Sequence, residues 1–233
     1  MKLAIMQPYF FPYIGYFQLI NAVDEFVIYD NIEFTKKGWI NRNRILVNGT
    51  DAIISLPLKK DSDYLHVSER FLADTWGIER NKMLNRIKES YRKAPFFKET
   101  YLLLEKCLMY DDRNLFNFIL HSVQTIMQYL NIYTKLVVSS SIPIEIQLKG
   151  VDKVMAICKQ RGADIYINPI GGLELYDKES FDKNGLKLQF LKANNITYTQ
   201  FNNEFIPFLS IIDVLMFNNK EELKSNLNSF SLY

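Results

Sequence analysis

Two short apolar runs joined by a helical segment fill the first 30 residues and constrain the fold most strongly. Residues 2–6 (KLAIM) and 25–30 (EFVIYD) have the length and the β-rich composition of buried strands. Between them, apolar residues over 13–23 recur at helical spacing, after a loop in which Pro8 cannot donate to a strand ladder. If both strands lie in one sheet, they are parallel and their crossover is right-handed. This pattern predicts an α/β fold.

The same alternation continues along the rest of the chain. A β-hairpin is predicted at 44–58, because Asn48-Gly49 between two β-rich runs is the strongest short hairpin signal. The other expected elements are helices at 78–92, 96–109, 114–130, 150–162 and 207–218 and strands at 135–141, 163–169 and 186–192. No linker or repeat divides the chain. We therefore expect one domain over residues 1–233, a Rossmann-like and mostly parallel sheet with a helical block inserted at about 78–130.

The composition excludes several classes of protein. An apolar content of 48% and a charged content of 23% over 233 residues are typical of a globular chain with a large core. The net charge of +2 is too small to indicate nucleic acid binding by itself. The N-terminal apolar run is short and interrupted by Gln7 and Pro8, which fits neither a secretory signal nor a membrane span. We expect a cytoplasmic protein that makes no membrane contact.

Metal and nucleophile patterns are missing from the sequence. The two histidines lie in unrelated segments, and no Cys-x-x-Cys or His-x-x-x-His spacing occurs, so no metal site is predicted. Cys107 and Cys158 fall in expected helices and are predicted to be reduced core thiols. No serine has the surroundings of a nucleophile elbow.

The stretch MQPYFFPYIGY, residues 6–16, is stiff and aromatic and leaves the first strand at its carboxyl end. Ligands of open parallel sheets bind beyond that end of the strands, so this loop is predicted to form a wall of a binding site. The residues that it offers are Gln7, Tyr9, Tyr13 and Gly15. The alternative is a rigid loop whose aromatic rings pack into the core. The loop is similar to that of nucleotidyltransferases and pantothenate-synthetase-like ligases, but Tyr13-Ile14-Gly15-Tyr16 stands where those enzymes carry His-x-Gly-His, which argues against their phosphate chemistry.

A basic segment follows the second expected strand. Residues 35–44 (TKKGWINRNR) carry four positive charges and no negative charge. Arginine forks and amides bind phosphates or carboxylates, and basic residues around a tryptophan suit a nucleotide diphosphate with a stacked ring or sugar. The candidate binding residues are Lys37, Trp39, Asn41, Arg42, Asn43 and Arg44. The alternative is a solvated basic loop that leads into the hairpin.

Paired glycines follow a later strand, in INPIGGLELYD at residues 167–177. A strand followed by two glycines can form a nest of backbone N–H groups for an anion, although the spacing matches neither a Walker loop nor the dinucleotide fingerprint. The candidate residues are Asn168, Gly171, Gly172 and Tyr176, with Glu174 as an acidic group between them. The alternative is a Pro-Gly turn between two elements.

Five stretches together resemble the WbqC-like family. They are MQPYFFPYIGYFQLI at 6–20, GWINRNRI at 38–45, YRKAPFF at 91–97, YINPIGGLELYD at 166–177 and FLSIIDVLMFN at 208–218, and they span nearly the whole chain. The positions that match the family's motifs are Gln7, Pro8, Tyr9, Pro12, Gly15, Asp30, Trp39, Asn41, Arg42, Asn43, Tyr91, Asn168, Gly171, Gly172 and Tyr176. Many relatives have a glutamine where this chain has Glu33.

The resemblance implies a role in bacterial surface-polysaccharide biosynthesis, notably of the lipopolysaccharide O-antigen. The implied activity is a transferase or ligase reaction that forms an amide between an amino acid such as glycine and the amino group of a nucleotide-linked amino sugar. The implied partners are that sugar nucleotide and an amino acid or activated aminoacyl donor. ATP and aminoacyl-tRNA are both open as the source of activation, although a net charge of +2 disfavours a tRNA.

An amide-forming enzyme needs a proton acceptor and hydrogen-bond donors for the oxyanion. Asp30 is the first candidate for the catalytic base because it ends a strand in an expected half-buried cleft, and Glu174 is the second. Arg42 and Arg44 would hold a pyrophosphate. The tyrosines of the opening loop would stack on the nucleotide or sugar, and the asparagines or the glycine pair would serve the oxyanion.

Two other classes of function stay open. A non-catalytic nucleotide-sugar-binding protein, or a scaffold of a polysaccharide assembly pathway, needs the same cleft and no base. A glycosyltransferase needs an Asp-x-Asp-like metal pair at a strand end, whereas Asp111-Asp112 joins two expected helices.

Overall fold

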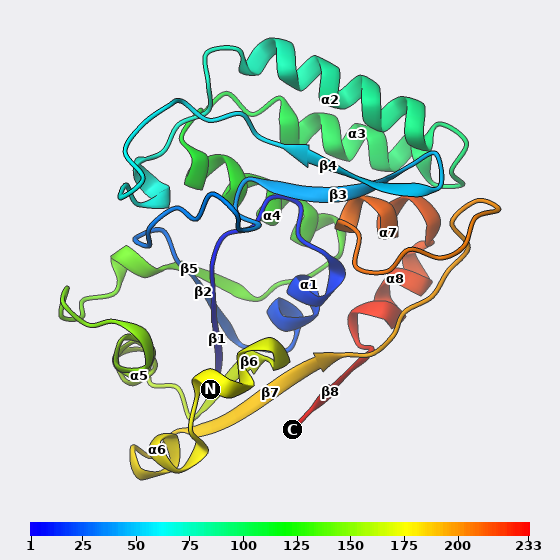
Figure 1. The fold of residues 1–233 in the computed structure, drawn as a ribbon. Helices are drawn as coiled ribbons and strands as arrows, with labels where there is room; N and C mark the ends of the chain where they lie inside the picture. The colour runs from blue at the N-terminus through cyan, green and yellow to red at the C-terminus, as the bar shows by residue number, and fades with distance from the viewer.

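The computed structural model describes all 233 residues and has a six-stranded sheet at its centre (Figure 1). The strands lie in the order β5-β2-β1-β6-β7-β8. Their bounds are β1 Lys2–Met6, β2 Glu25–Ile28, β5 Lys135–Val138, β6 Ile165–Pro169, β7 Lys187–Ala193 and β8 Phe230–Leu232. All neighbours are parallel except β7 and β8, which are antiparallel. The predicted α/β fold with a mostly parallel sheet is confirmed.

The strand order reverses beside β1. From β1 the chain builds outward through β2 to β5 on one side, and it then returns to build β6 and β7 on the other side. A reversal of this kind leaves a crevice beyond the carboxyl ends of the two central strands, where ligands of such sheets bind. The carboxyl ends of β1 and β6 therefore mark the place to look for a site.

Alternate residues of each strand enter two separate cores, one on each face of the sheet. On β1, Ala4 belongs to the larger core and its neighbours Leu3 and Ile5 belong to the smaller one, as the two-residue period of a strand requires. The larger core is covered by helices α1 (Ile14–Asn21), α4 (Leu115–Tyr129), α7 (Ile211–Phe217) and α8 (Lys220–Leu227). The smaller core is covered by α5 (Gly150–Arg161) and α6 (Lys178–Lys183). The molecule is thus layered helix, sheet, helix.

A separate hairpin of β3 (Arg42–Val47) and β4 (Thr50–Ser55) lies outside the main sheet. Asn48 and Gly49 form its turn with φ values of +51° and +77°, as an Asn-Gly hairpin turn requires. Figure 1 shows the hairpin beside α2 (Trp76–Tyr91) and α3 (Phe97–Leu108), whose buried side chains join the larger core. No helix of the molecule combines the length and the apolar character that crossing a membrane requires.

The last predicted helix begins later than expected. The pattern predicts a helix from 207, but α7 starts at Ile211, because Ser210 caps it by accepting a hydrogen bond from the Ile212 N–H and Phe208 has a φ of +57°. The 135–141 strand also ends early, since Ser139–Ser141 form a short 3-10 turn, η2. These shifts leave residues 207–210 as a loop beside the carboxyl end of the sheet.

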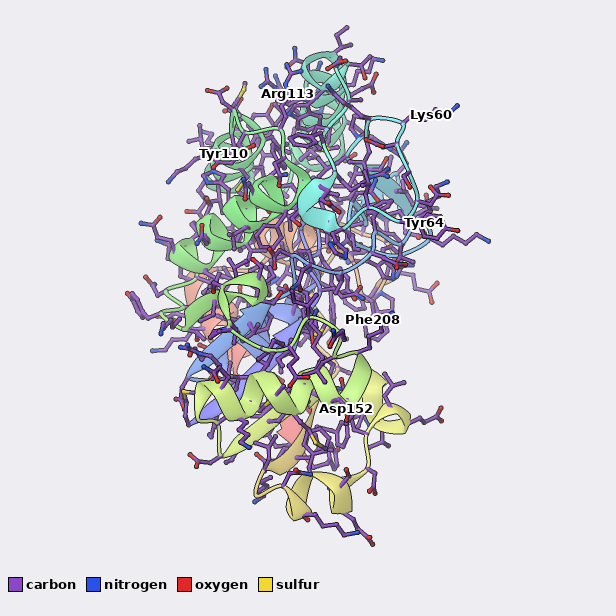
Figure 2. The ribbon with its side chains drawn as sticks, turned by 90° about the vertical axis from the view of Figure 1, so that its left-hand side faces the viewer. Lys60, Tyr64, Tyr110, Arg113, Asp152 and Phe208 are labelled. Atoms are coloured by element: carbon purple, nitrogen blue, oxygen red, sulfur yellow. The ribbon has the colours of Figure 1, made fainter.

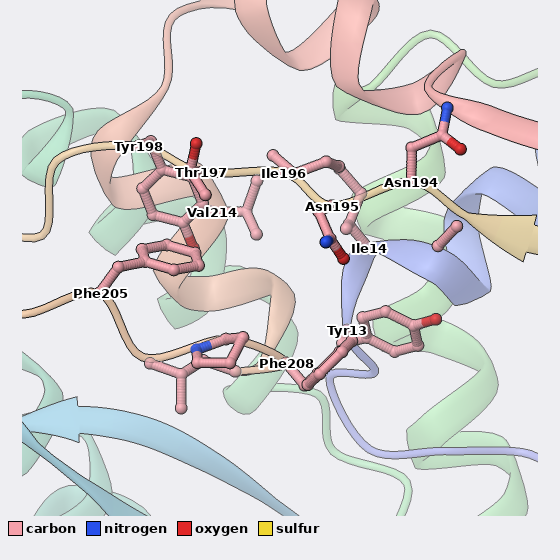
Figure 3. A pocket seen from close by; sticks show the side chains of 13 residues that line it. Tyr13, Ile14, Asn194, Asn195, Ile196, Thr197, Tyr198, Phe205, Phe208 and Val214 are labelled. Atoms are coloured by element: carbon pink, nitrogen blue, oxygen red, sulfur yellow. The ribbon is translucent and has the colours of Figure 1, made fainter.

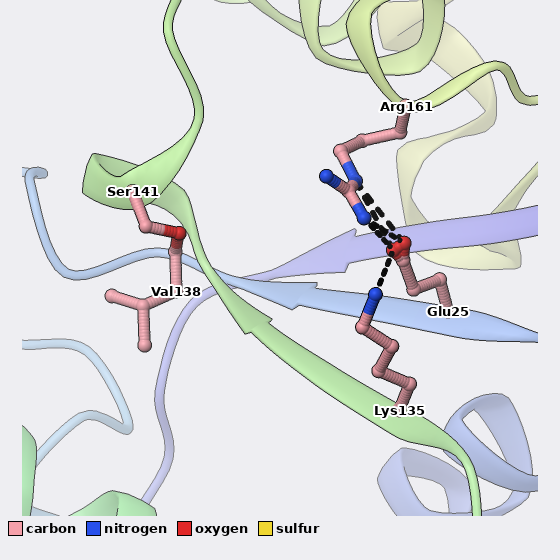
Figure 4. Close-up of polar contacts among 5 residues, drawn as sticks. All are labelled: Glu25, Lys135, Val138, Ser141 and Arg161. Carbon is pink, nitrogen blue, oxygen red and sulfur yellow. Dashed lines mark hydrogen bonds and ion pairs between the residues drawn. The ribbon is translucent and has the colours of Figure 1, made fainter.

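A cluster of three charged side chains lies at the amino end of the sheet (Figure 4). Glu25, on the first residue of β2, is only 3% exposed. The Arg161 guanidinium, from the last turn of α5, contacts both carboxylate oxygens of Glu25, with an Nη2–Oε2 distance of 2.6 Å and an Nε–Oε1 distance of 3.1 Å. Lys135 at the start of β5 adds a longer contact of 3.7 Å. The buried charge at this end is therefore compensated within the fold.

Candidate functional site

A cavity of about 500 Å³ lies where the strand order reverses. Met6 at the end of β1, Pro169 at the end of β6 and Leu191 on β7 contribute to its lining. The loop after β1, the basic segment before β3 and the loop before α7 complete it, with Tyr9, Pro12, Tyr13, Gly15, Tyr16, Trp39, Asn43, Arg44, Ile170, Gly171 and Phe208 among the lining residues. We call this cavity the switch-point cleft.

The aromatic loop after β1 divides its side chains between the core and the cleft. Phe10 and Phe11 are fully buried, with ring centroids 4.4 Å apart, whereas Tyr9 and Tyr13 are half-buried and line the cleft. Asn43 holds the loop by donating from Nδ2 to the Phe10 and Phe11 carbonyls, at 3.2 and 2.9 Å. Each of the two interpretations of this loop, core packing and binding wall, therefore fits a different part of it.

The tyrosines of the cleft present hydroxyl donors. Burial raises the pKa of the Tyr9 and Tyr13 phenols, so both stay protonated at neutral pH. Gly15 allows Tyr13 its position, because a Cβ placed on Gly15 would lie 2.0 Å from the Tyr13 hydroxyl oxygen. Gln7 is half-buried and is tied into the loop, with its carbonyl accepting a 3.0 Å hydrogen bond from Tyr16 Oη.

Two guanidinium groups flank an exposed indole at the cleft. Trp39 is 43% exposed, and the Cζ atoms of Arg42 and Arg44 lie 5.7 and 5.8 Å from its ring centroid. The two arginines share one face of β3, with Asn43 pointing to the opposite, buried face. Arg42 donates from Nε to the Gly38 carbonyl at 2.9 Å, which fixes the turn that carries Trp39.

Arg44 reaches from the basic segment to the far wall of the cleft. Its Nη1 lies 3.2 Å from Asp51 Oδ2, and its Nη2 lies 3.5 Å from the Phe208 carbonyl oxygen. A guanidinium has five N–H donors, so these two contacts leave further donors of Arg44, a cleft-lining residue, unused. The arrangement of indole, cation and tyrosine hydroxyls suits a ligand with a flat ring and an anionic group.

The glycine pair after β6 has a packing role as well as a position at the cleft. Gly171 lines the cleft, whereas Gly172 is buried against Asn168, whose Nδ2 would lie 2.1 Å from a Cβ at position 172. Asn168 accepts a 3.0 Å hydrogen bond from Tyr166 Oη and donates to the Pro169 carbonyl. Tyr176 packs edge-on against Tyr166 in the smaller core.

The two predicted proton acceptors lie outside the lining of the cleft. Asp30 follows β2, is 7% exposed, and accepts hydrogen bonds at Oδ1 from Ser139 Oγ at 2.8 Å and from the Ser140 N–H at 2.9 Å. Lys153 lies close by, and desolvation lowers its pKa while the Asp30 charge acts against that shift. Glu174 is exposed on the short 3-10 helix η3 (Ile170–Leu175).

Eight of the predicted binding residues are not part of the cleft lining, namely Gln7, Lys37, Asn41, Arg42, Tyr91, Asn168, Gly172 and Tyr176. Tyr91 is fully buried and donates from its hydroxyl to Asp213 Oδ1 at 2.8 Å. Asn41 donates to the carbonyl of Leu56, the residue after β4, at 2.9 Å. The Lys37 side chain is exposed. The structure thus gathers Tyr9, Tyr13, Gly15, Trp39, Asn43, Arg44 and Gly171 around one cavity, with Arg42 against the indole.

Phe208 lines the cleft without having been predicted. It is 63% exposed, has a φ of +57°, and lies edge-on to Tyr13 with 6.0 Å between ring centroids. Phe208 falls inside the helix predicted from 207, and Pro207 is compatible with the first turn of a helix, so no sequence signal pointed to its place at the cleft.

The chain matches known sequences over nearly its whole length. The model of the WbqC-like protein family covers residues 7–225. Over 217 residues, which are 92% of each chain, the protein is 30% identical to the uncharacterized protein Rv1507c of Mycobacterium tuberculosis (strain ATCC 25618 / H37Rv). No solved structure gives a significant match. All residues that line the cleft except Met6 lie within the matched range, and the chain belongs to the WbqC-like protein family.

Proposed function

We propose that the switch-point cleft binds a nucleotide-linked amino sugar and that the protein forms an amide on the sugar's amino group in the biosynthesis of a surface polysaccharide such as the O-antigen. The observation that carries the proposal is the exposed Trp39 ring with the guanidinium carbons of Arg42 and Arg44 5.7 and 5.8 Å from its centroid, beside the reversal of strand order. An indole stacks on a base, and guanidiniums pair with a diphosphate. Tyr9 and Tyr13 offer their hydroxyls to the sugar.

The reaction that we propose is acyl or aminoacyl transfer in the cytoplasm. The neutral amine nitrogen attacks the carbonyl carbon of an activated donor, a C–N bond forms, and the bond between the carbonyl carbon and the leaving group breaks. The leaving group departs with the bonding electron pair and takes up, directly or through water, the proton that the amine gives up. Arg44 and the Gly171 N–H are the groups of the cleft that can stabilise negative charge on the oxygen.

A second function is favoured by one observation. No aspartate or glutamate lines the switch-point cleft, and both predicted proton acceptors lie outside it. A protein that binds a sugar nucleotide without acting on it has no need of such a group. The second candidate is therefore a non-catalytic nucleotide-sugar-binding or scaffold protein of the same pathway.

Titration calorimetry with UDP, and with dTDP in parallel, tests the binding proposal. Replacing Trp39 with alanine should weaken nucleoside diphosphate binding about tenfold, because a stacked aromatic platform contributes about 1–3 kcal/mol per base. Tyr64→Ala is the matched control, since Tyr64 is 81% exposed (Figure 2) and lies outside the lining of the switch-point cleft. Equal affinities for wild type and Trp39→Ala would contradict the proposal.

Product analysis separates the two candidate functions. The wild-type protein is incubated with a nucleotide-linked 4-amino sugar, glycine and ATP, and in a second reaction with glycyl-tRNA in place of ATP and glycine. A mass increase on the sugar nucleotide that corresponds to amide formation supports the transferase. Tight sugar-nucleotide binding with no product from either donor supports the binding protein.

A further inference from the structure

A second cavity of about 270 Å³ adjoins the switch-point cleft (Figure 3). Tyr13, Ala193 and Phe208 line both cavities. The edge-on pair of Tyr13 and Phe208 therefore stands between them. We call this second cavity the side cleft.

No charged side chain lines the side cleft. Its 13 lining residues include no aspartate, glutamate, lysine, arginine or histidine. Ile196, Phe205 and Val214 give it apolar walls, and Asn194, Asn195 and Thr197 supply uncharged hydrogen-bonding groups (Figure 3). A charged ligand would lose its hydration there without gaining an ion pair, which is unfavourable. An uncharged group with an apolar body has no charge to desolvate, so its binding avoids that penalty.

A buried hydrogen-bond network fixes the wall of the side cleft. Tyr198, which lines it, donates to Asp213 Oδ2 at 2.6 Å, and Gln200 Nε2 donates to the same oxygen at 2.7 Å. The Tyr198 ring also lies edge-on to Phe205, with 5.1 Å between centroids. Residues 194–198 belong to no helix or strand, so this network is what orders them before a ligand arrives.

The same network joins the side cleft to the switch-point cleft. Tyr91 donates to Asp213 and accepts a 2.7 Å hydrogen bond from the Leu46 N–H, on the strand that carries Arg44. The Ser210 N–H donates to the Arg44 carbonyl at 2.8 Å, which ties the Phe208 loop to that strand. The two cavities therefore share one frame and form two chambers of one site.

We propose that the side cleft is the subsite for the acyl part of the second substrate and that it takes an uncharged acyl group. The proposal rests on the proposed function, since it assigns the sugar nucleotide to the cationic chamber and the acyl group to the uncharged one. A free amino acid would carry an ammonium and a carboxylate into a chamber that pairs with neither. The acyl carbon would meet the sugar amine beside Tyr13 and Phe208, where the chambers join.

Three small probes with six carbon atoms each test the charge preference. Hexanamide, hexanoate and hexylammonium are compared by saturation-transfer NMR on the wild-type protein. Hexanamide should bind at least about tenfold more tightly than either ion, because only the ions lose a hydrated charge. Equal binding of the three probes, or tighter binding of either ion, would overturn the proposal.

Two exposed lining positions locate the bound probe. Thr197→Trp and Asn195→Trp place a large ring at the side cleft and should each reduce hexanamide binding at least about fivefold. Thr199→Trp is the matched control, because Thr199 is exposed nearby and lies outside the lining. Undiminished hexanamide binding in both folded variants would show that the probe binds elsewhere and would contradict the assignment of the side cleft as the acyl subsite.

A nucleotide titration on the same samples keeps the two proposals apart. UDP binding that survives in Thr197→Trp, together with lost hexanamide binding, supports two chambers. Hexanamide binding in the side cleft without any nucleoside diphosphate binding would refute the proposed function while the uncharged subsite stands. UDP binding without hexanamide binding would refute the subsite alone.

Discussion

The two ends of the sheet differ in how their charged side chains are paired. At the amino end, the buried Glu25 carboxylate is held by Arg161 and Lys135, so each charge has an opposite partner inside the fold (Figure 4). Beside the carboxyl end, the buried Asp213 carboxylate is held by neutral donors alone, while Arg42 and Arg44 flank an exposed indole. Arg161 is held by a buried carboxylate, whereas Arg44 is paired with the partly exposed Asp51 and lines the cleft, and this is the difference that we relate to the proposed anion binding.

Two phenylalanines at the carboxyl end have strained backbone conformations. Phe11 and Phe208 both have positive φ values, +41° and +57°, and both belong to loops at the carboxyl end. Such conformations cost free energy in residues other than glycine and persist only where the surroundings enforce them. Here Asn43 and Ser210 enforce the Phe11 conformation by donating to its carbonyl. The strained loops therefore hold the cleft's shape before a ligand binds.

The largest expected effect is at the amino end. Arg161→Ala leaves the Glu25 carboxylate buried with only the long Lys135 contact, so the free energy of unfolding should fall by about 3 kcal/mol. Urea denaturation measures this loss. Lys135→Ala is the matched control and should cost under about 1 kcal/mol, since the Lys135 side chain is 66% exposed. UDP affinity should be unchanged in both variants; a loss of UDP affinity in Arg161→Ala would end the contrast between the two ends.

The buried carboxylate beside the clefts should have an intermediate effect. Asp213→Asn replaces one of the two oxygens that accept hydrogen bonds with an NH2 group. The free energy of unfolding of this variant at acidic pH should therefore lie about 2 kcal/mol below that of the wild type. Burial raises the pKa of Asp213 above its ordinary value of 3.8, although hydrogen bonds from Tyr198, Tyr91 and Gln200 act to lower it.

The pH dependence of that difference has a definite sign. Because the folded-state pKa is raised, the unfolded chain ionises first as the pH rises, which favours unfolding. The wild type's advantage over Asp213→Asn should be greatest below 3.8 and should shrink as the pH rises through the raised pKa. Denaturation curves of both proteins between acid and neutral pH measure it. An advantage that grows with pH would mean that the network depresses the pKa.

The sheet and the position of the site could be predicted because they depend on local patterns. The runs at 2–6 and 25–30 are apolar and β-rich, and the helical spacing between them leaves a parallel crossover as the simplest connection. The hairpin followed from Asn48-Gly49 in the same way. The strand ends then located the cleft, since ligand sites in such sheets follow from topology.

Elements whose stability comes from tertiary packing were missed. Helix α8 is polar apart from Leu223 and Leu227, which alone are buried, so its sequence gives a weak helical pattern. β8 has three residues and forms only by pairing with β7. Neither could be predicted from a period, because the partner supplies the stabilisation.

Residue type alone could not distinguish the predicted residues that line the cleft from those that stabilise the fold. Arg44 and Asn41 lie three residues apart in one basic segment, yet Arg44 lines the cleft and Asn41 is tied to the Leu56 carbonyl. Tyr91 matches a family motif and is fully buried against Asp213. Side chains that build a frame and side chains that face a ligand share the same amides and hydroxyls, so only their surroundings separate them.

The smallest expected effect tests Arg44, whose guanidinium contacts Asp51 and lines the cleft. Arg44→Lys keeps the positive charge but removes the planar fork, so UDP should bind about threefold to fivefold more weakly, and the free energy of unfolding should change by under about 0.5 kcal/mol. Arg113→Lys is the matched control, because Arg113 also pairs with an exposed aspartate, at 3.7 Å from Asp74, and lies outside the cleft (Figure 2). Calorimetry on the two variants measures the difference. If Arg44→Lys left UDP affinity unchanged while lowering stability, Arg44 would be neutralised by Asp51 as fully as Arg161 is by Glu25, and the two ends of the sheet would no longer differ in this respect.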